Sequence, residues 1–242
     1  MSNELVILPG WGLGVEPLQP LAQALTAALP DFHVQLQPLP SIKGQSEASI
    51  LQQLEQQLPE NCWLLGWSLG GMLATAVAAQ RQSRCAGLIT YASNACFVAH
   101  DNWPAAMPAA TFSAFRQLCQ DDLGAGLKRF ALLCSQGAEQ ARQLSRQLQV
   151  LTTTAEPGDA LAGLDLLAAL DNRAAISSFT GAQLHVLAEA DALVPASAAV
   201  LLQALNPKAS VAWLGQSHAS VMTDAPLLAQ RIAAFIQGVE HA

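Results

Sequence analysis

Charged side chains are scarce in this chain of 242 residues: 12% of the residues are charged, 5% are aromatic, and the net charge is −7. A nucleic-acid-binding domain shows a basic face in its composition, so the acidic balance argues against that class of protein. Hydrophobic residues make up 52% of the chain, which supplies enough apolar surface for a folded core and excludes a disordered chain. The length fits one large α/β domain, alone or with an inserted subdomain.

Long apolar runs and paired cysteine motifs are also missing. The longest nearly apolar run, Leu69 to Ala79, falls well short of the roughly 18 residues that cross a bilayer, and Met1-Ser2-Asn3-Glu4 lacks the basic start of a signal peptide. The five cysteines are an odd number without a C-x-x-C pair, and most lie inside apolar segments, as reduced thiols do. We therefore expect a cytoplasmic protein without a membrane span.

Short apolar runs alternate with helical periodicity at both ends of the chain. Continuous apolarity is typical of strands in a parallel sheet that is covered on both faces. We predict buried strands at residues 5–8, 63–65, 87–91, 184–188 and 211–214, and helices at residues 17–29, 47–58, 69–80, 195–205 and 225–237. The alternation predicts an α/β fold with a mostly parallel, doubly wound sheet.

The middle of the chain breaks this alternation. Residues 104–171 carry helical patterns at 111–119, 123–134, 139–150 and 160–170, with no convincing strand between them. We interpret this segment as a helical cap inserted into an α/β core made of residues 1–103 and 172–242. Between Arg116 and Arg146 lie five basic and three acidic residues, a net +2 that leaves −9 for the rest of the chain. Such charges form either a solvated helix face or a binding surface, and composition alone favours the former.

The most specific motif is Gly66-Trp67-Ser68-Leu69-Gly70, a G-x-S-x-G that follows a predicted strand and opens a predicted helix. In a nucleophile elbow the serine stands on a strained strand-to-helix turn, and glycines two residues away on either side let the chain pass its neighbours. The following helix places backbone N–H groups and the positive end of its dipole beside the serine. We predict that Ser68 is a nucleophile rather than an incidental serine in a glycine-rich turn.

A serine hydroxyl needs a general base, and the base needs a third group that orients it. His218 follows the last predicted strand, and Asp191 lies between a predicted strand and a predicted helix, so both loops open at the sheet edge of Ser68. The chain order serine, aspartate, histidine is one in which such triads occur. Weaker candidates for the acid are Glu189, Asp171 and Asp224. The other histidines, in strand-like or terminal surroundings, are His33, His100, His185 and His241.

Negative charge that develops on an attacked carbonyl group needs hydrogen-bond donors. We predict these donors to be the backbone amides of Leu69 and of Trp11, the latter in the loop Pro9-Gly10-Trp11-Gly12-Leu13-Gly14 after the first strand. The glycines of this loop also suggest a dinucleotide fingerprint, but its third position is Val15 and the next strand-like run ends in Gln37 rather than an acid, so we reject that reading. The sequence shows no P-loop, flavin motif or metal-ligand cluster, and we expect no cofactor and no metal.

These motifs resemble those of the α/β-hydrolase superfamily and, more narrowly, those of the pimeloyl-[acyl-carrier protein] methyl ester esterases of biotin synthesis. The resemblance covers nearly the whole chain. The stretches that carry it are Leu8-Pro9-Gly10-Trp11-Gly12-Leu13, Gly66-Trp67-Ser68-Leu69-Gly70-Gly71, Ala92-Ser93-Asn94-Ala95-Cys96-Phe97, Asp101-Asn102-Trp103-Pro104, Leu127-Lys128-Arg129-Phe130, Ala141-Arg142-Gln143 with Arg146, and His218-Ala219 with Pro226. The first two are shared with many hydrolases, whereas the Cys96-Phe97 and Trp103-Pro104 stretches and the cap are more particular to the esterases.

The resemblance implies an α/β-hydrolase fold and a serine hydrolase that cleaves the methyl ester of pimeloyl-[acyl-carrier protein] to methanol and a free carboxylate. It implies the catalytic roles of nucleophile, acid and base for Ser68, Asp191 and His218. It further implies substrate contacts at Trp11, Leu69, Phe130, Cys134 and His218.

The resemblance also implies that basic cap residues hold the acidic acyl carrier protein. Matching positions are Arg129, Arg142 and Arg146, and a fourth is replaced by Ala125, with Lys128 as a substitute. The chain departs from the family pattern at Pro9, where a histidine usually precedes the oxyanion glycine. It also starts directly at the oxyanion-loop strand, so we expect a sheet that is one or two strands shorter than in most relatives.

Three other functions share these motifs. A broad short-chain carboxylesterase would leave its cap charges merely solvated. A ligand-binding module with a hydrolase fold would not turn its ligand over, and the complete set Ser68, Asp191 and His218 argues against it. A C–C bond hydrolase or a menaquinone-type lyase carries the same triad and is not separated by spacing. We expect a monomeric esterase whose partner is an acyl carrier protein.

Overall fold

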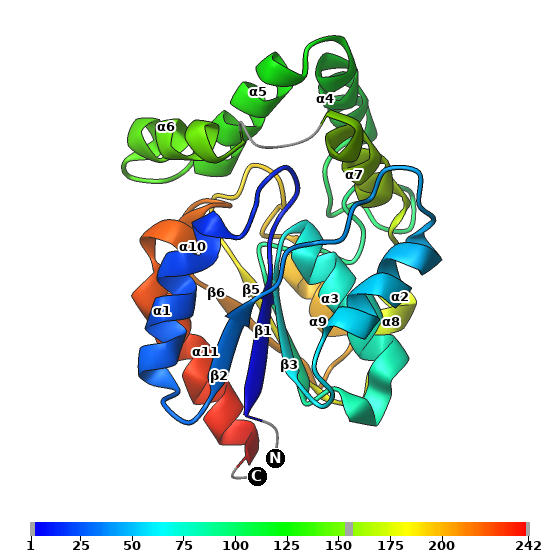
Figure 1. Ribbon diagram of the computed structural model, residues 1–242. Helices are drawn as coiled ribbons and strands as arrows, with labels where there is room; N and C mark the ends of the chain where they lie inside the picture. The colour runs from blue at the N-terminus through cyan, green and yellow to red at the C-terminus, as the bar shows by residue number, and fades with distance from the viewer. Residues whose placement is uncertain (1–2, 153–156, 241–242) are drawn as a thin grey trace.

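The computed structural model describes residues 3–152 and 157–240. One sheet of six parallel strands runs through the described chain (Figure 1). The strands are β1 (Glu4–Leu8), β2 (His33–Leu36), β3 (Trp63–Trp67), β4 (Gly87–Tyr91), β5 (Ala182–Leu187) and β6 (Ser210–Trp213). Their order is β2-β1-β3-β4-β5-β6, so the direction of winding reverses after β2. A crevice for ligands forms at such a reversal, here at the carboxyl ends of β1 and β3.

Helices cover both faces of the sheet, as the doubly wound prediction requires. On one face α1 (Gln19–Ala28) packs along α11 (Ala225–Glu240), with the short α10 (Ser220–Thr223) above them (Figure 1). The other face carries α2 (Glu47–Gln57), α3 (Leu69–Arg81), α8 (Arg173–Ser178) and α9 (Ala198–Leu205), each in contact with the next. Single turns of 3₁₀ helix occur at Glu16–Leu18 and Gln82–Arg84.

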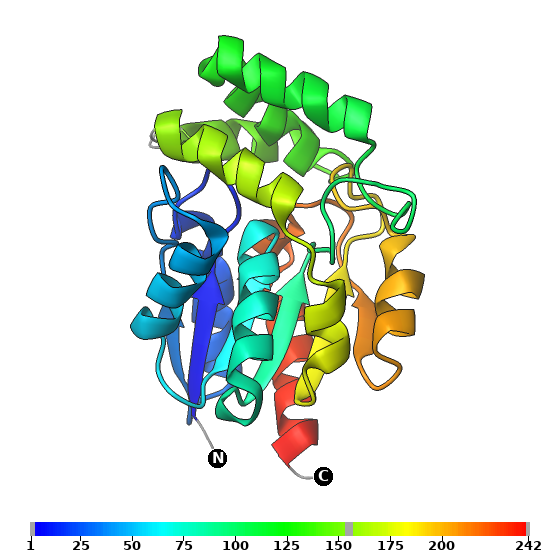
Figure 2. The same cartoon turned by 90° about the vertical axis from the view of Figure 1, so that its right-hand side faces the viewer.

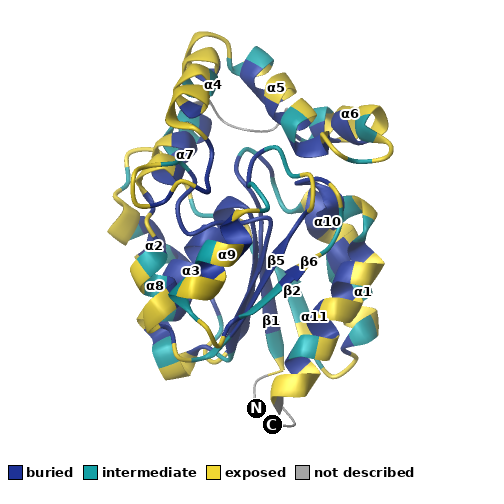
Figure 3. Ribbon diagram, turned by 180° about the vertical axis from the view of Figure 1, so that it is seen from behind, coloured by how far each residue is buried: buried dark blue, intermediate teal, exposed yellow. Residues whose placement is uncertain are grey.

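Burial follows the strand order. Every residue of β3 and β4 is buried, and in β1 only Glu4 has partial exposure. The edge strands β2 and β6 are partly exposed. Figure 3 shows the same pattern in the helices, whose buried sides face the sheet. β2 is not among the strands that continuous apolarity predicts, because its residues His33–Leu36 alternate between polar and apolar.

Four helices form a layer above the carboxyl ends of the strands (Figure 2). They are α4 (Ala109–Asp121), α5 (Leu123–Ser135), α6 (Ala141–Thr152) and α7 (Pro157–Ala169). Each overlaps one of the helical patterns predicted for the cap, and we refer to the four as the cap. The division of the chain at residues 103/104 and 171/172 stays a prediction.

All five cysteines are buried free thiols. Burial raises the pKa of Cys85 and Cys96 to about 12 each, and it raises the pKa of Cys119 to about 11. The thiols therefore behave as small apolar core groups, as expected. Among the described residues, no helix combines the length and the apolar character needed to span a bilayer.

Candidate active site

Ser68 lies on the sharp turn between β3 and α3, with a backbone φ of 55° and ψ of −119°. A positive φ is uncommon for a residue with a side chain and costs on the order of 1–3 kcal/mol. The flanking glycines allow this turn to pack. A Cβ atom on Gly66 would strike the backbone of α3, and one on Gly70 would lie 2.5 Å from the carbonyl oxygen of Leu8 in β1. The strand-turn-helix setting predicted for the nucleophile elbow is present.

Asp191, after β5, and His218, after β6, form a buried pair. The distance between His218 Nδ1 and Asp191 Oδ2 is 2.8 Å, and both side chains are 0% exposed. The second carboxylate oxygen accepts the backbone N–H groups of Leu193 at 2.8 Å and Val194 at 3.0 Å. Acceptors facing Nδ1 favour the tautomer with the imidazole proton on that atom, which leaves a lone pair on Nε2.

The Nε2 atom of His218 is buried and has no hydrogen-bond partner among the described residues. Ser68 is also buried, and its hydroxyl makes no hydrogen bond with the imidazole. Trp67 links the two, because its indole N–H donates to the carbonyl oxygen of His218 at 2.9 Å and its ring centroid lies 5.9 Å from the imidazole. The contact between a nucleophile and its base is often long in the absence of substrate. Sequence reasoning did not single out Trp67, since the variable position of the motif gives no signal.

None of the weaker candidates for the acid contacts His218. Glu189 is exposed, Asp171 forms an ion pair with Arg173 at 2.6 Å, and Asp224 lies at the start of α11. The pairing of His218 therefore distinguishes Asp191 from its rivals by geometry.

The other described histidines lie away from Ser68 and its loops. His33 is exposed beside Glu4, and His100 is exposed. His185 is buried in β5, where Nδ1 lies 2.8 Å from the Thr90 hydroxyl, and burial lowers its pKa to about 4. His241 lies outside the described residues.

The loop after β1 brings Gly10 against the nucleophile. A Cβ atom on Gly10 would lie 3.4 Å from Cβ of Ser68. Trp11 follows Gly10, and Leu69 follows Ser68, so the two predicted oxyanion donors flank the serine. Neither backbone amide donates a hydrogen bond to another described residue. No other described residue therefore occupies either N–H group, and their role as oxyanion donors stays a prediction.

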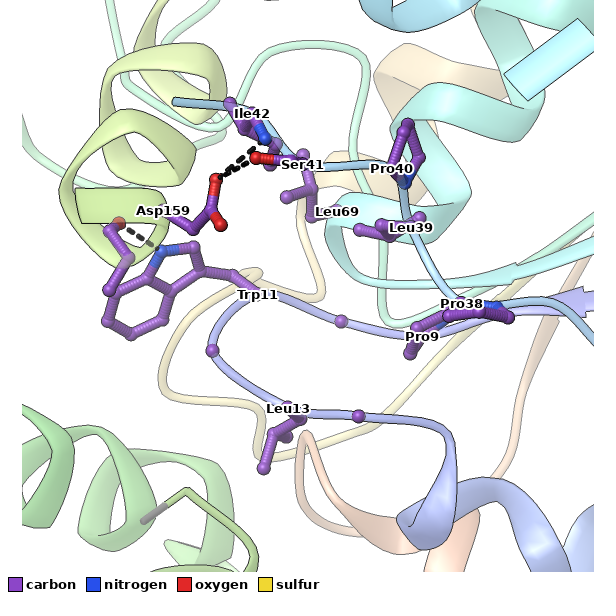
Figure 4. Close-up of a pocket in the computed structure, with 14 residues that line it drawn as sticks. Pro9, Trp11, Leu13, Pro38, Leu39, Pro40, Ser41, Ile42, Leu69 and Asp159 are labelled. Atoms are coloured by element: carbon purple, nitrogen blue, oxygen red, sulfur yellow. Dashed lines mark hydrogen bonds between the residues drawn. The ribbon is translucent and has the colours of Figure 1, made fainter. Parts of the chain in front are cut away.

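Two spaces meet at Trp11. An enclosed apolar cavity of about 20 Å³ touches Ser68 and lies under the cap; it is lined by Trp11, Ser68, Phe97, Met107, Phe115, Phe130, Leu133, Leu164, Leu167 and Leu193. A more open cleft of about 360 Å³ lies on the other side, between the oxyanion loop, residues 38–42 and the start of α7 (Figure 4). Leu69 lines the open cleft. The enclosed cavity has room for about one water molecule.

The remaining predicted substrate contacts come from α5. Phe130 lines the enclosed cavity and meets the Trp11 indole edge to face, with ring centroids 4.8 Å apart. Cys134 is fully buried and does not line that cavity, and its carbonyl oxygen accepts the backbone N–H of Ala219. Burial first, and then the charge of Asp191, raises the pKa of the Cys134 thiol. A contact between Cys134 and substrate stays a prediction.

Four basic residues on α5 and α6 are exposed: Lys128, Arg129, Arg142 and Arg146, here called the cap cations. None of them forms an ion pair with an acidic residue in the described part of the chain. Arg116 on α4 differs, because its guanidinium group binds Asp165 of α7 at 2.6 Å. Arg116 therefore belongs to a paired, solvated helix face, whereas for the exposed cap cations the choice between a solvated face and a binding surface stays a prediction.

One group of side chains within the described ranges could offer three ligand atoms to a metal ion. Cys96, His100 and Asp171 each place one such atom within 4.8 Å of the others. The Asp171 carboxylate is already engaged by Arg173, which holds the pKa of Asp171 well below its usual range. The group is therefore a poor cation site, and none of its members contacts Asp191 or His218.

The sequence profile of the alpha/beta hydrolase family matches residues 5–231. The chain belongs to the alpha/beta hydrolase family. The pimeloyl-[acyl-carrier protein] methyl ester esterase of Serratia marcescens is similar to this hydrolase in sequence. The two are 35% identical over 245 residues, which cover 97% of the chain and 94% of the relative. The pimeloyl-[acyl-carrier protein] methyl ester esterase of Yersinia enterocolitica is 32% identical over 244 residues, which cover 97% of the chain and 93% of that relative.

A second relative joins two activities in one chain. The biotin biosynthesis bifunctional protein BioHC of Cellvibrio japonicus is 40% identical to this hydrolase over 222 residues, which cover 89% of the chain but 44% of the relative. The hydrolase therefore spans less than half the length of the bifunctional protein. Among solved structures, the bromoperoxidase of Bacillus anthracis matches with a TM-score of 0.84 at 19% identity, over 98% of this chain and 92% of the other. That likeness shows the fold alone.

Proposed function

We propose that the protein is a serine esterase of biotin synthesis that hydrolyses the methyl ester of pimeloyl-[acyl-carrier protein]. The observation that carries the chemical part is the unexposed Asp191–His218 pair beside the strained Ser68 turn. The relatives support the proposed substrate. Two of them, 35% and 32% identical to this chain, are named pimeloyl-[acyl-carrier protein] methyl ester esterases.

The reaction has two halves that use the same three side chains. His218 Nε2 takes the proton of the Ser68 hydroxyl while the Ser68 oxygen attacks the ester carbonyl carbon. The amides of Trp11 and Leu69 donate to the oxyanion of the tetrahedral intermediate, which collapses as methanol leaves with the proton from His218. Water then loses a proton to His218 and attacks the acyl-enzyme carbonyl carbon. The bond to the Ser68 oxygen breaks, that oxygen takes the proton back from His218, and the free acid is released. Asp191 holds the imidazole in the required tautomer and stabilises its charged form.

The cap must move or repack for this reaction. A cavity of about 20 Å³ at Ser68 does not hold a methyl ester group, whose carbonyl carbon has to approach the serine oxygen closely. Opening of the cap helices, followed by closure over the acyl chain, would admit the ester and exclude bulk water. The acyl carrier protein is too large to enter such a site. We therefore propose that only its prosthetic arm, with the acyl chain, reaches Ser68.

The cap cations supply the surface for the carrier protein. They are exposed and free of ion pairs with described acidic residues, so an acidic partner gains their attraction without breaking existing pairs. Charges at such a distance from the reacting atoms accelerate encounter and fix orientation. An enzyme that acts on a carrier-borne ester works where the carrier is, and we therefore place it in the cytoplasm, as a monomer.

Two substrates separate this function from that of a broad esterase. We expect kcat/KM on pimeloyl-[acyl-carrier protein] methyl ester to exceed that on p-nitrophenyl butyrate and to fall as salt is raised from 50 to 300 mM, because screening weakens the carrier contact. The small ester should show no such salt effect. Equal rates without a salt effect would remove the carrier protein from the proposal and leave a broad short-chain carboxylesterase.

Labelling and growth test the chemistry and the pathway separately. A fluorophosphonate probe should label the protein, and Ser68→Ala with an unchanged melting temperature should not be labelled. A protein that is folded but unlabelled would be a binding module instead. The gene should restore biotin-free growth to a strain that lacks its own pimeloyl ester esterase, and the Ser68→Ala gene should not.

A further inference from the structure

The Trp11 side chain is held by the cap rather than by its own loop. Its indole N–H donates to the carbonyl oxygen of Ala160 in α7 at 2.7 Å (Figure 4). A Cβ atom on Gly163, one turn further along α7, would lie 2.7 Å from Cδ1 and 2.9 Å from Nε1 of the indole. The ring therefore lies directly on the helix backbone, in a place that only glycine leaves free. Phe115 and Phe130 contact the same ring edge to face.

The first turn of α7 is in turn fixed to the core. One oxygen of the Asp159 carboxylate accepts three hydrogen bonds, from the Ser41 hydroxyl at 2.9 Å and from the backbone N–H groups of Ile42 and Lys43 at 2.8 Å each. These contacts lower the pKa of Asp159, the Lys43 backbone N–H contributing most. Ser41, Ile42 and Lys43 belong to the loop that follows β2. Figure 4 shows Asp159 reaching from α7 toward Ser41 and Ile42, and the Trp11 indole lying at the same end of the helix.

The oxyanion loop cannot supply this rigidity itself. Trp11 stands between Gly10 and Gly12, and Gly12 has a φ of +66°. Glycine restricts the backbone least of all residues, so the direction of the Trp11 N–H is set mainly by whatever holds its side chain. A displacement of about 1 Å in a catalytic group is enough to cost on the order of a hundredfold in rate.

We infer that Gly163 and Asp159 are positioning residues that aim the Trp11 backbone N–H at the oxyanion. Gly163 gives the indole its seat on α7, and Asp159 fixes that end of α7 to the loop after β2. The inference rests on the proposed role of Trp11 as an oxyanion donor, and it makes one cap helix part of the support for the chemistry.

Gly163→Ala is the direct test, since alanine favours the helix but places a methyl group against the indole. We expect kcat on p-nitrophenyl butyrate to fall about 10- to 100-fold, with KM within about threefold of wild type, because a misplaced oxyanion donor weakens the transition state more than substrate binding. Affinity for a trifluoromethyl ketone, whose adduct with Ser68 carries an oxyanion, should fall by the same factor as kcat. Gly238→Ala in α11 is the matched control, because its Cβ meets nothing within 4 Å.

Asp159 gives a second, independent variant. Asp159→Ala should lower kcat about fivefold, and Asp159→Asn, which keeps an oxygen acceptor for Ile42 and Lys43, should restore most of the loss. A Gly163→Ala enzyme with wild-type kcat and wild-type ketone affinity would overturn the inference. A variant with a lower kcat, a higher KM and a lower melting temperature but an unchanged ketone affinity would also overturn it, because a purely structural role gives that result.

Failure of the proposed function gives a different result. In that case the wild-type protein itself is not labelled by a fluorophosphonate and does not hydrolyse p-nitrophenyl butyrate. An active, labelled wild type together with an unchanged Gly163→Ala enzyme overturns the positioning role alone.

Discussion

The core beneath the site and the cap above it hold their charged groups in opposite ways. In the core, Asp191 and His218 have no exposed side-chain surface and are paired at 2.8 Å. On the cap, the cap cations are exposed and have no acidic partner among the described residues. A buried pair is barely screened and acts on any ester that reaches Ser68, whereas exposed charges are screened by salt and act only on a charged partner. Core substitutions should therefore affect all substrates alike, and cap substitutions should separate them.

The largest effect is expected at the core pair. Asp191→Asn keeps the size of the side chain but removes its charge and allows the wrong imidazole tautomer, so kcat should fall about 10⁴-fold on both the small and the carrier-borne ester. Steady-state kinetics on both esters would measure the loss. The control is Glu189→Gln, which changes an exposed carboxylate two residues away and should leave kcat within about twofold. A loss confined to one ester would contradict the comparison.

The next effect concerns stability at acid pH. Burial lowers the pKa of His185 in the folded protein to about 4, whereas its pKa in the unfolded chain is about 6.5. Between pH 6.5 and pH 4, therefore, only the unfolded chain binds a proton at this residue. The stability from keeping His185 neutral is present above pH 6.5 and is lost as the pH falls toward 4, by about 3 kcal/mol in total.

Urea unfolding at pH 7, 5.5 and 4.5 would measure this loss. His185→Gln should have a flatter pH dependence than wild type, whereas His33→Gln, at an exposed site, should follow the wild-type curve. Identical slopes for the wild type and His185→Gln would show that acid sensitivity does not come from this core residue.

A smaller effect is expected on the cap, and only with the carrier-borne ester. Neutralising two cap cations in Arg142→Gln/Arg146→Gln should lower kcat/KM on that ester about tenfold at 50 mM salt, with less loss at 300 mM. Hydrolysis of p-nitrophenyl butyrate should not change. Arg116→Gln is the matched control, because Arg116 also lies on the cap but already binds Asp165. Equal losses in the double variant and in the control would place the carrier elsewhere.

The smallest effect is expected at that same cap ion pair. Arg116 is 36% and Asp165 is 56% exposed, so Arg116→Ala should lower the free energy of unfolding by less than about 1 kcal/mol. Arg81 in the core lies 3.3 Å from the Glu55 carboxylate and also donates to the carbonyl oxygens of Glu55, Leu58 and Pro59. Arg81→Ala should cost about 3 kcal/mol or more, because it leaves buried acceptors unpaired. Similar losses at the two arginines, measured by urea unfolding, would contradict the contrast.

The sequence predicted those parts of the fold whose burial leaves a pattern. β3 and β4 are buried along their whole length, and both were predicted from continuous apolarity. β2 and α8 were not predicted, because β2 alternates polar and apolar residues and a helix of six residues is too short to show a period. The position of Ser68 on its turn was predictable because the turn imposes glycine at fixed distances, and loop order selected Asp191 and His218.

Contacts between distant residues left no such pattern. The hydrogen bond from Trp11 to Ala160 joins residues 149 positions apart, and nothing in the helical period of α7 marks Gly163 as a seat for an indole ring. Asp159 likewise resembles an ordinary acidic residue in the first turn of a helix, where the helix dipole by itself favours a negative charge. Only the packing of the cap on the core shows what these residues hold.

Because the five native thiols are buried, the cap can be labelled selectively with a dye. A thiol reacts through its thiolate form, so the native cysteines, enclosed and with raised pKa values where burial acts on them, are slow toward maleimides. A cysteine introduced at Leu132, a position on α5 that is 51% exposed, would be labelled far faster than any of them. A dye could therefore be attached to the cap of the otherwise native enzyme, and its emission followed while the ester is being turned over.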